Sequence, residues 1–313
     1  MTMAVHPRKF RFGAKAVKAG SAKEWNDIVR QVEDLGYVSF HMDDHFGNQL
    51  AVVPALMAAA EATSTLLVGP HVAGVDFRNP VLFAKECATI DLLSEGRLTL
   101  GIGAGWSEKD YAIAGIHQDS AATRIGRLRE AVQVIKGLWG EGPFSFAGEH
   151  YVVAEVDAVP KPYSPIPIMI GGGGAKILTL AAEEADIVGI NPKIVGRKIN
   201  PESMATTAAD VMDEKLDAVR AAAGDRFDEL ELQLQVFKTV VTDNPQEAAE
   251  QLAPAFGLSP EVMLGAPFFQ IGTVEQITEN VQAMRERWGI SYVLFQTDGI
   301  VPMAPVVDRL AGT

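Results

Sequence analysis

The sequence predicts an α/β protein whose residues 1–313 form a single (β/α)8 TIM barrel, with insertions in the loops that follow strands. Three observations predict this fold. Strand-like and helix-like segments alternate from one end of the chain to the other, about eight of each. Residues 66–102 read as strand, helix, strand, which is a parallel crossover. The 313 residues, 48% of them hydrophobic, are enough to build one large core.

The predicted strands are short segments in which apolar residues run together or alternate with small or polar ones. In chain order they cover residues 10–14, 37–42, 66–72, 98–102, 166–170, 186–190, 230–241 and 292–295. His41 lies within the second of these strands, so we expect it to pack inside the barrel.

The predicted helices alternate with these strands. The first covers residues 22–36, because Ser21 can cap it and Glu24 completes a capping box. The third begins at Pro80 and ends at Glu95-Gly96. The others cover residues 52–62, 121–139, 175–184, 204–223, 274–288 and 302–310.

Three insertions interrupt the alternation. Residues 140–165 read as a hairpin that turns at Ala147-Gly148. Residues 191–203 form a loop without apolar periodicity, and residues 244–266 add a short helix and a turn. Because the loops after barrel strands carry function, the second and third insertions are candidate substrate lids. The hairpin fits surface packing equally well.

Composition excludes several classes of function. The formal net charge of −13 argues against nucleic acid or an anionic membrane surface as the main partner. No apolar run reaches the roughly 18 residues of a membrane span, and the first residues do not resemble a signal peptide. Cys87 is the single cysteine and no paired histidine motif is present, so we expect no metal site and a buried structural thiol. These features together predict a cytoplasmic protein.

Four consecutive glycines, Gly171, Gly172, Gly173 and Gly174, follow an apolar strand and precede a helix. Glycine lets the backbone approach a ligand closely, and the free N–H groups of a helix start attract an anion. A phosphate group is the expected ligand, although a tight strand-to-helix turn is the alternative. Residues 101–105, GIGAG, fail the dinucleotide fingerprint because the third glycine is missing, which disfavours a Rossmann dehydrogenase.

Two histidines stand at predicted strand ends. Asp44 and His45 follow the second strand, and Phe46 gives this polar pair an apolar wall. A histidine there can move a proton near neutral pH, so His45 is a candidate catalytic residue; a plain turn is the alternative. His71 ends the third strand, where it is either a site residue or a satisfied core histidine.

These pieces, in this order and spacing, resemble the bacterial luciferase-like superfamily, whose members hold a flavin or deazaflavin in a (β/α)8 barrel. The resemblance is carried by the following segments: residues 44–46 (DHF), 77–80 (FRNP), 88–97 (ATIDLLSEGR), 101–106 (GIGAGW) and 171–174 (GGGG). It covers most of residues 10–190. Within the superfamily the chain is most similar to the deazaflavin (coenzyme F420)-dependent oxidoreductases.

The resemblance implies roles for individual residues. His45, with Asp44 beside it, matches the acid/base position next to the cofactor ring, and the His71–Val72 peptide bond matches a non-proline cis bond behind that ring. The implied cofactor-binding residues are Asp44, His71, Val72, Ala73, Lys109, Gly171, Gly172, Gly173, Gly174, Val188 and Gly189. Phe46, Trp106 and Tyr111 would line the substrate pocket. Some relatives carry a glutamate where Trp106 stands, which suggests a substrate more apolar than a sugar phosphate.

The function implied by the resemblance is hydride transfer between coenzyme F420 and a small organic substrate. One alternative is an FMN-dependent monooxygenase that receives reduced flavin from a separate reductase. An alternative of another class is a flavin-binding protein without turnover. Relatives commonly pair through barrel helices, so the resemblance also implies a homodimer.

Overall fold

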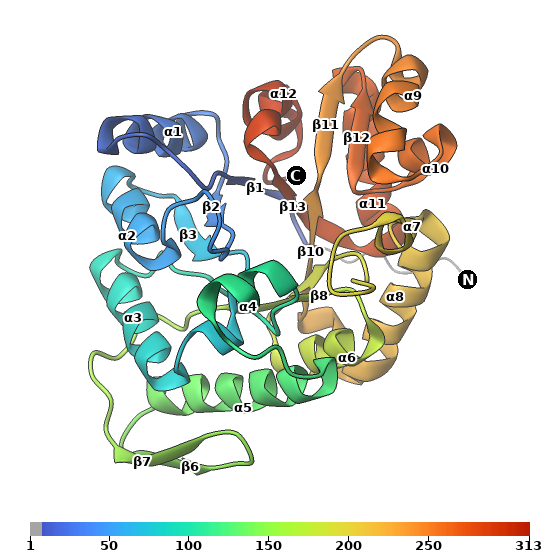
Figure 1. Cartoon of the computed structure of the whole chain (residues 1–313). Coiled ribbons are helices and arrows are strands. Elements are labelled where there is room, and N and C mark those ends of the chain that lie inside the picture. The colour runs from blue at the N-terminus through green and yellow to red at the C-terminus, as the bar shows by residue number, and fades with distance from the viewer. Residues whose placement is uncertain (1–7) are drawn as a thin grey trace.

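A computed structural model describes residues 8–313, and its central feature is a sheet of nine strands in which every neighbouring pair is parallel (Figure 1). Their order across the sheet is β3-β2-β1-β13-β10-β9-β8-β5-β4. The strands are β1 (Arg11–Lys15), β2 (Ser39–Met42), β3 (Leu67–Pro70), β4 (Ala73–Gly74), β5 (Leu100–Gly103), β8 (Ile168–Gly172), β9 (Ile187–Ile190), β10 (Glu231–Val236) and β13 (Ile290–Phe295).

The sheet closes on itself through β3 and β4. These two strands are successive parts of one stretch of chain, yet β3 pairs with β2 and β4 pairs with β5. An isolated parallel bridge between Val68 and Leu98 adds to the closure. Taking β3 and β4 as one interrupted strand leaves the eight positions of a barrel, so the predicted (β/α)8 TIM barrel is confirmed. The bond between His71 and Val72, at the interruption, is cis.

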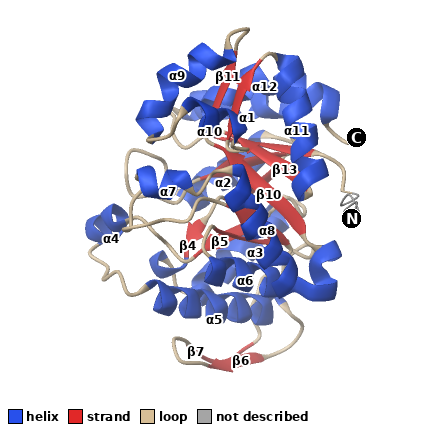
Figure 2. Cartoon of the chain, turned by 90° about the vertical axis from the view of Figure 1, so that its right-hand side faces the viewer, coloured by secondary structure: helices blue, strands red, loops and turns tan. Residues whose placement is uncertain are grey.

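A ring of helices covers the outside of the barrel (Figure 2). The ring consists of α1 (Ala22–Asp34), α2 (Val52–Ala62), α3 (Pro80–Leu93), α5 (Ala121–Trp139), α6 (Ala175–Glu184), α8 (Ala209–Ala223), α11 (Val274–Trp288) and α12 (Ile300–Leu310). Each begins within four residues of a predicted start except α8, which begins at Ala209 rather than Met204. The predicted N-cap of α1 is confirmed, since the Ser21 side chain accepts a hydrogen bond from Glu24 N. The predicted capping box is not formed, because the Glu24 carboxylate accepts from Gly20 N instead of from the backbone N–H of Ser21.

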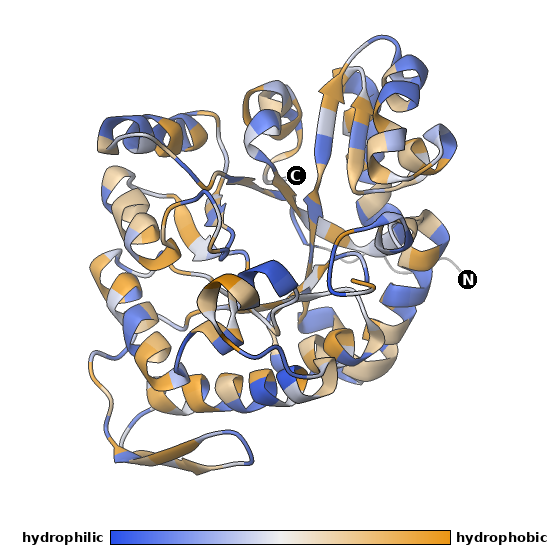
Figure 3. Cartoon of the chain, viewed as in Figure 1, coloured by the Kyte–Doolittle hydropathy of each residue, from blue (hydrophilic) through white to orange (hydrophobic). Residues whose placement is uncertain are grey.

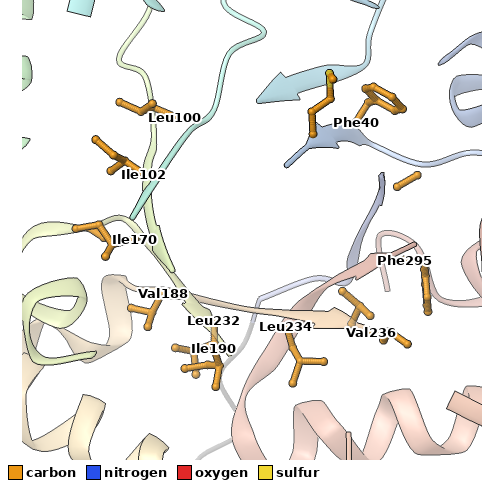
Figure 4. Packing of buried hydrophobic residues seen from close by; sticks show 14 of the residues in the cluster. Phe40, Leu100, Ile102, Ile170, Val188, Ile190, Leu232, Leu234, Val236 and Phe295 are labelled. Carbon is orange, nitrogen blue, oxygen red and sulfur yellow. The ribbon is translucent and has the colours of Figure 1, made fainter. Parts of the chain in front are cut away.

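The core lies between the strands and the helices, and it contains buried residues from Phe10 to Leu310 (Figure 4). The period of two along a strand sorts side chains between its faces. In β10 the side chains of Leu232, Leu234 and Val236 point out of the barrel and are apolar. The side chains between them, Gln233 and Gln235, point into the barrel interior. The surrounding helices carry apolar residues toward the sheet and polar ones toward solvent, as Figure 3 shows for α1, whose buried residues include Trp25 and Val29.

The insertions depart from the prediction in their details. The hairpin is confirmed as β6 (Phe144–Ala147) and β7 (Val152–Val156), which pair antiparallel. The predicted single strand 230–241 is wrong, because β10 ends at Val236 and β11 (Lys238–Val241) leaves the barrel to pair with β12 (Phe269–Gly272), a strand that was not predicted. The alternation breaks at the apolar pair Val236-Phe237, but such a break alone does not reveal that a strand changes sheets.

Four further helices lie in the loops. The insertion at residues 244–266 holds two of them, α9 (Pro245–Phe256) and α10 (Pro260–Gly265), where one was predicted. The other two are α4 (Glu108–Ala114), which follows β5, and α7 (Pro201–Ala205), which follows β9. Within residues 8–313, no helix is both long enough and apolar enough to span a lipid bilayer.

Candidate active site

A cavity of about 690 Å³ opens at the carboxyl ends of the barrel strands. Every barrel position contributes to its wall, because parallel strands deliver their ends to one side of the barrel. Its lining includes Lys15 after β1, Asp43 to His45 after β2, His71 and Val72 before β4, Gly103 to Ser107 after β5, Gly171 to Gly174 at β8, Asn191 to Ile194 after β9, Gln235 and Phe237 at β10, and Gln296 after β13. The volume suits an organic ligand with a ring system.

His45 and Asp110 form a hydrogen-bonded pair at the cavity wall. His45 Nδ1 lies 2.7 Å from Asp110 Oδ2, and Phe46 N donates to Asp110 Oδ1 at 3.1 Å. Burial raises the pKa of Asp110, but hydrogen bonds from Ser107, Phe46 and His45 outweigh it and hold that pKa below its usual value. An ionised carboxylate accepts the Nδ1 proton, which leaves Nε2 free to accept a proton from a ligand.

Trp106 completes this side of the cavity. Its ring meets the imidazole of His45 edge to face, with 5.7 Å between the ring centroids. Trp106 therefore places an apolar surface next to the one group of the pair that can exchange a proton with a ligand. Gln118 Nε2 donates a hydrogen bond to the backbone carbonyl oxygen of Trp106 at 3.1 Å, which fixes the turn that carries the ring.

Asp44 also lines the cavity, yet its carboxylate is engaged by the protein. Arg78 binds both of its oxygens, and Gly74 N donates to Oδ2 at 2.9 Å. This arrangement anchors the turn after β4, so Asp44 positions the chain behind the cavity. Its assignment to catalysis and to cofactor binding stays a prediction. Arg78 belongs to the FRNP segment at residues 77–80, and this carboxylate is its partner.

Val72 forms the back of the cavity. A Cβ at Gly103 would lie 2.6 Å from Val72 Cγ2, and one at Gly171 would lie 3.2 Å from Val72 Cγ1, so the valine occupies the space that two glycines leave open. Beside it, His71 Nε2 lies 3.2 Å from Gln233 Oε1. Burial, with the Lys15 charge nearby, lowers the pKa of His71 to about 4. His71 is therefore neutral and donates from Nε2.

A second buried histidine, His41, lies beneath the cavity. His41 is buried inside the barrel as predicted, with Nδ1 3.1 Å from Gly69 O and Nε2 2.6 Å from Tyr292 Oη. Burial holds the pKa of His41 well below its usual value, so the ring is neutral. Since a carbonyl can only accept, Nδ1 carries the proton and Tyr292 donates to Nε2. Ser39 Oγ, 2.6 Å from Tyr292 Oη, then donates to the phenol.

The four glycines form a turn that leads into α6. All four line the cavity, and no side chain caps the helix at Gly174, so the N–H groups of its first turn face the same space as Lys176 and Lys193. A Cβ at Gly173 would lie 2.2 Å from Asn191 O, which makes glycine necessary there. The turn, the helix start and the two ammonium groups form a setting that favours an anion.

The other predicted site residues do not line the cavity. Ala73 is buried in β4, Gly189 pairs with Gly171 in the sheet, and Val188 points into the core outside the barrel (Figure 4). Phe46 meets Phe77 edge to face and is 42% exposed, and Lys109 is exposed on α4. Contacts between these residues and a ligand stay predictions.

Tyr111 was predicted in the substrate pocket and instead supports it. The ring is buried and its hydroxyl donates to Asp76 Oδ2 at 2.7 Å, directly under Gly105. Sequence reasoning missed the Lys15–Asp43 ion pair (2.8 Å), Gln235 and Gln296, which lie at the ends of strands, and Asp110. The strand-end positions could have been found from the predicted strands. Nothing in the sequence signals that Asp110 meets a histidine 65 positions earlier.

The model of the luciferase-like monooxygenase family matches residues 8–289. An F420-dependent glucose-6-phosphate dehydrogenase of Amycolatopsis mediterranei (strain U-32) is 30% identical over 164 residues, which cover 50% of this chain and 49% of that protein. The chain thus spans about half the length of this relative. A 5,10-methylenetetrahydromethanopterin reductase of Archaeoglobus fulgidus is 34% identical over 221 residues, 70% of this chain and 61% of that protein.

Among solved structures, an F420-dependent secondary alcohol dehydrogenase in complex with an F420-acetone adduct superposes with a TM-score of 0.78. It is 19% identical, and the match covers 97% of this chain and 99% of that chain. A coenzyme F420-dependent tetrahydromethanopterin reductase from Methanopyrus kandleri gives a TM-score of 0.77 at 18% identity, covering 97% and 99%. At these identities the likeness supports the fold.

Proposed function

Because the chain belongs to the luciferase-like monooxygenase family, we propose that it is an oxidoreductase that transfers a hydride between the deazaflavin coenzyme F420 and a small organic substrate. The observation that carries the proposal is that one cavity is lined by the glycine turn at the start of α6, with Lys176 and Lys193 beside it, by the hydrogen-bonded His45–Asp110 pair and by Val72. Relatives at about 30% identity that are named as F420-dependent dehydrogenases support the choice of coenzyme.

The residues of the cavity fit such a coenzyme. The N–H groups of Gly173 to Lys176, with the ammonium groups of Lys176 and Lys193, would hold its phosphate. Val72, seated between Gly103 and Gly171, would support the ring system from behind. When bound, a deazaflavin supplies the two-electron hydride chemistry, and the protein supplies binding, orientation and a proton path.

The chain's own contribution to chemistry would come from His45. Asp110 holds the imidazole with its proton on Nδ1, so Nε2 can take the proton of a substrate hydroxyl or, once protonated, return it to a carbonyl oxygen. Trp106 covers the adjacent wall and lies against one side of the imidazole. An alcohol, ketone, enone or imine with an apolar body is the substrate class that this wall accepts.

An FMN-dependent monooxygenase is the second candidate, because the matching family model is described as a luciferase-like monooxygenase. Fluorescence titration of purified protein with F420 and FMN in parallel separates the two. We expect F420 to bind at least about tenfold more tightly than FMN, a difference of about 1.4 kcal/mol. Preferential FMN binding, followed by oxygen uptake with a reductase, would establish the second candidate. Failure of both ligands to bind would refute the proposal.

A further inference from the structure

One wall of the cavity is built by residues 191–206, which make up most of the chain between β9 and α8 and which we call the β9–α8 segment. Asn191, Pro192, Lys193, Ile194 and Ile199 of this segment line the cavity. The segment includes α7 and lies beside α4 in Figure 1, near the mouth of the barrel. It contains the stretch that the sequence predicted as a candidate lid.

Lys215 of α8 bonds to both ends of the β9–α8 segment. Its Nζ donates to Asn191 O at 2.9 Å and to Thr206 O at 2.7 Å. The residue is 6% exposed, and the face of the Phe268 ring lies 5.8 Å from Nζ. A single buried ammonium group therefore closes a loop of chain by joining its first and last carbonyl groups.

The bond to Asn191 also reaches the glycine turn. The same Asn191 carbonyl oxygen lies where a Cβ at Gly173 would be only 2.2 Å away, and Asn191 N donates to Gly172 O at 2.9 Å. Lys215, Asn191 and the glycine turn thus form a continuous line of contacts from α8 to the anion-binding side of the cavity.

Apart from the bonds from Asn191 N to Gly172 O (2.9 Å) and from Glu108 N to Arg197 O (3.4 Å), the other hydrogen bonds of the segment within the described residues are internal. Lys193 N donates to Thr206 Oγ1, Val195 N to Ser203 Oγ, and Ser203 N to Asn200 Oδ1. Such bonds keep the segment folded but do not fix it to the barrel. The two bonds from Lys215 do fix it, since α8 packs on α6 and belongs to the helical ring.

A purely structural explanation of Lys215 is unsatisfactory. Burying an ammonium group away from a carboxylate costs free energy, and this burial lowers the pKa of Lys215 to about 8. The charged side chains on the surrounding elements are engaged elsewhere or exposed: Asp213 with Arg287, Glu183 with Arg129, Glu184 with Lys136, and Lys193, Arg197, Lys198 and Glu202 toward solvent. A methionine would fill the same space at a lower cost unless the two carbonyl groups needed the donors.

We infer that Lys215 is a positioning residue whose ammonium group ties the two ends of the β9–α8 segment together and so holds one wall of the ligand cavity against the glycine turn. The part of this inference that concerns the ligand rests on the proposed function. The part that concerns the segment does not.

Hydrogen–deuterium exchange of the protein without ligand tests the second part. In Lys215→Met, exchange of peptides that cover residues 191–206 should accelerate at least about tenfold, while the barrel strands keep their protection. Lys215→Arg, which can donate to both carbonyls, should restore slow exchange. Glu214→Met, at the exposed neighbouring position of α8, is the matched control and should leave exchange unchanged. Unchanged exchange in Lys215→Met overturns the inference.

Titration of the same four proteins with F420 tests the first part. Lys215→Met should weaken binding at least about tenfold, and Lys215→Arg should recover most of the affinity. Faster exchange without a loss of affinity would show that the segment does not position the ligand and would overturn that part. If the unaltered protein does not bind F420 at all, the proposed function fails, while the exchange result still decides the role of Lys215.

Discussion

The carboxylate of Asp110 controls what His45 can do, because it decides which imidazole nitrogen carries the proton. Replacing Asp110 with Asn keeps a group of the same size but removes the charge that holds the Nδ1 proton and stabilises the imidazolium. We expect kcat to fall about 10- to 100-fold and F420 affinity to change less than about threefold. Steady-state kinetics with a matching titration measures both quantities.

His45→Ala should lower kcat at least as much as Asp110→Asn, and the double variant should be no worse than His45→Ala, because the carboxylate acts through the ring. Glu108→Gln, exposed two positions before Asp110 on α4, is the control and should keep the original kcat. A His45→Ala protein with full turnover would remove His45 from the reaction.

Adjacent glycines of the glycine turn should respond differently to the same substitution. A Cβ at Gly173 would collide with the Asn191 and Pro192 backbone at 2.2 and 2.3 Å, whereas a Cβ at Gly174 would meet nothing closer than Lys193 Cγ at 3.9 Å. Gly173→Ala should therefore displace the β9–α8 segment and weaken F420 binding more than about tenfold.

Urea unfolding provides the comparison between the two alanine variants. Gly174→Ala should change the free energy of unfolding by no more than about 1 kcal/mol, while Gly173→Ala should cost about 2 kcal/mol or more because backbone atoms must move. Equal stability of the two variants would show that the chain at residues 191–192 gives way easily.

The sequence predicted those site residues that come after the end of a predicted strand. His45 and the four glycines come directly after predicted strands, and all of them line the cavity. Asp110 and Lys215 could not be predicted, because each acts on a partner distant along the chain and sits in an ordinary helical context. Tyr111 was placed in the substrate pocket from its position in the loop, but its contact with Asp76 turns it inward.

Among the elements, the β6–β7 hairpin lies at the edge of the molecule beyond α5 in Figures 1 and 2, and none of its residues lines the cavity. One carboxylate on α5 holds its turn: Glu130 accepts hydrogen bonds from the backbone N–H groups of Glu149, His150 and Tyr151. Glu130→Ala leaves these three donors to water. We expect limited proteolysis at residues 148–151 to accelerate at least about fivefold through local opening, with F420 affinity unchanged.

Glu130→Gln separates the charge from the geometry in this experiment, because an amide oxygen can still accept part of the bonds. Intermediate proteolysis is expected for that variant. A large loss of F420 affinity in either variant would mean that the hairpin supports the site, contrary to its position in the structure.

The eight barrel strands were predictable as elements because burial of the outer face and closure of the interior give each one a short apolar or alternating pattern. The extension of β10 into β11 was not, although the alternation of residues 230–236 breaks at the apolar pair Val236-Phe237. What separates the two strands is a partner: Phe237 N bonds to Phe268 O, and β11 then pairs with β12. A single sequence contains no signal for the choice of partner.

At the scale of the whole molecule, the barrel is apolar outside and polar inside. Its interior contains Ser39, His41, His71, Gln233 and Tyr292. One set of hydrogen bonds joins Ser39, Tyr292 and His41 beneath the cavity, and another joins His71 to Gln233 at the back wall. An interior of this kind holds its side chains in place through these bonds, although Gln233 Nε2 lacks a hydrogen-bond partner. It also makes the stability of the fold depend on pH.

Both interior histidines are neutral in the folded protein. The pKa of His71 is lowered to about 4 by burial and the nearby Lys15, and the pKa of His41 is lowered by burial and the neighbouring His71. In the unfolded chain each has a pKa of about 6.5, so the unfolded state binds more protons in the window between these values. The free energy of unfolding must therefore decrease as the pH falls from about 6.5 to about 4.

Replacing His71 with Gln should remove its share of this acid sensitivity, up to about 1.4 kcal/mol per pH unit, while leaving the share of His41. Urea unfolding at several pH values between about 4 and 7 gives the slopes, and carboxylates that titrate there cancel in the comparison with the unaltered protein. His117→Gln is the control, since the side chain of His117 is 87% exposed and should leave the slope unchanged. If the free energy of unfolding depends on pH with the same slope in His71→Gln and in the unaltered protein, His71 accepts a proton while it stays in place. The interior of the barrel would then admit a charge more easily than its hydrogen bonds imply.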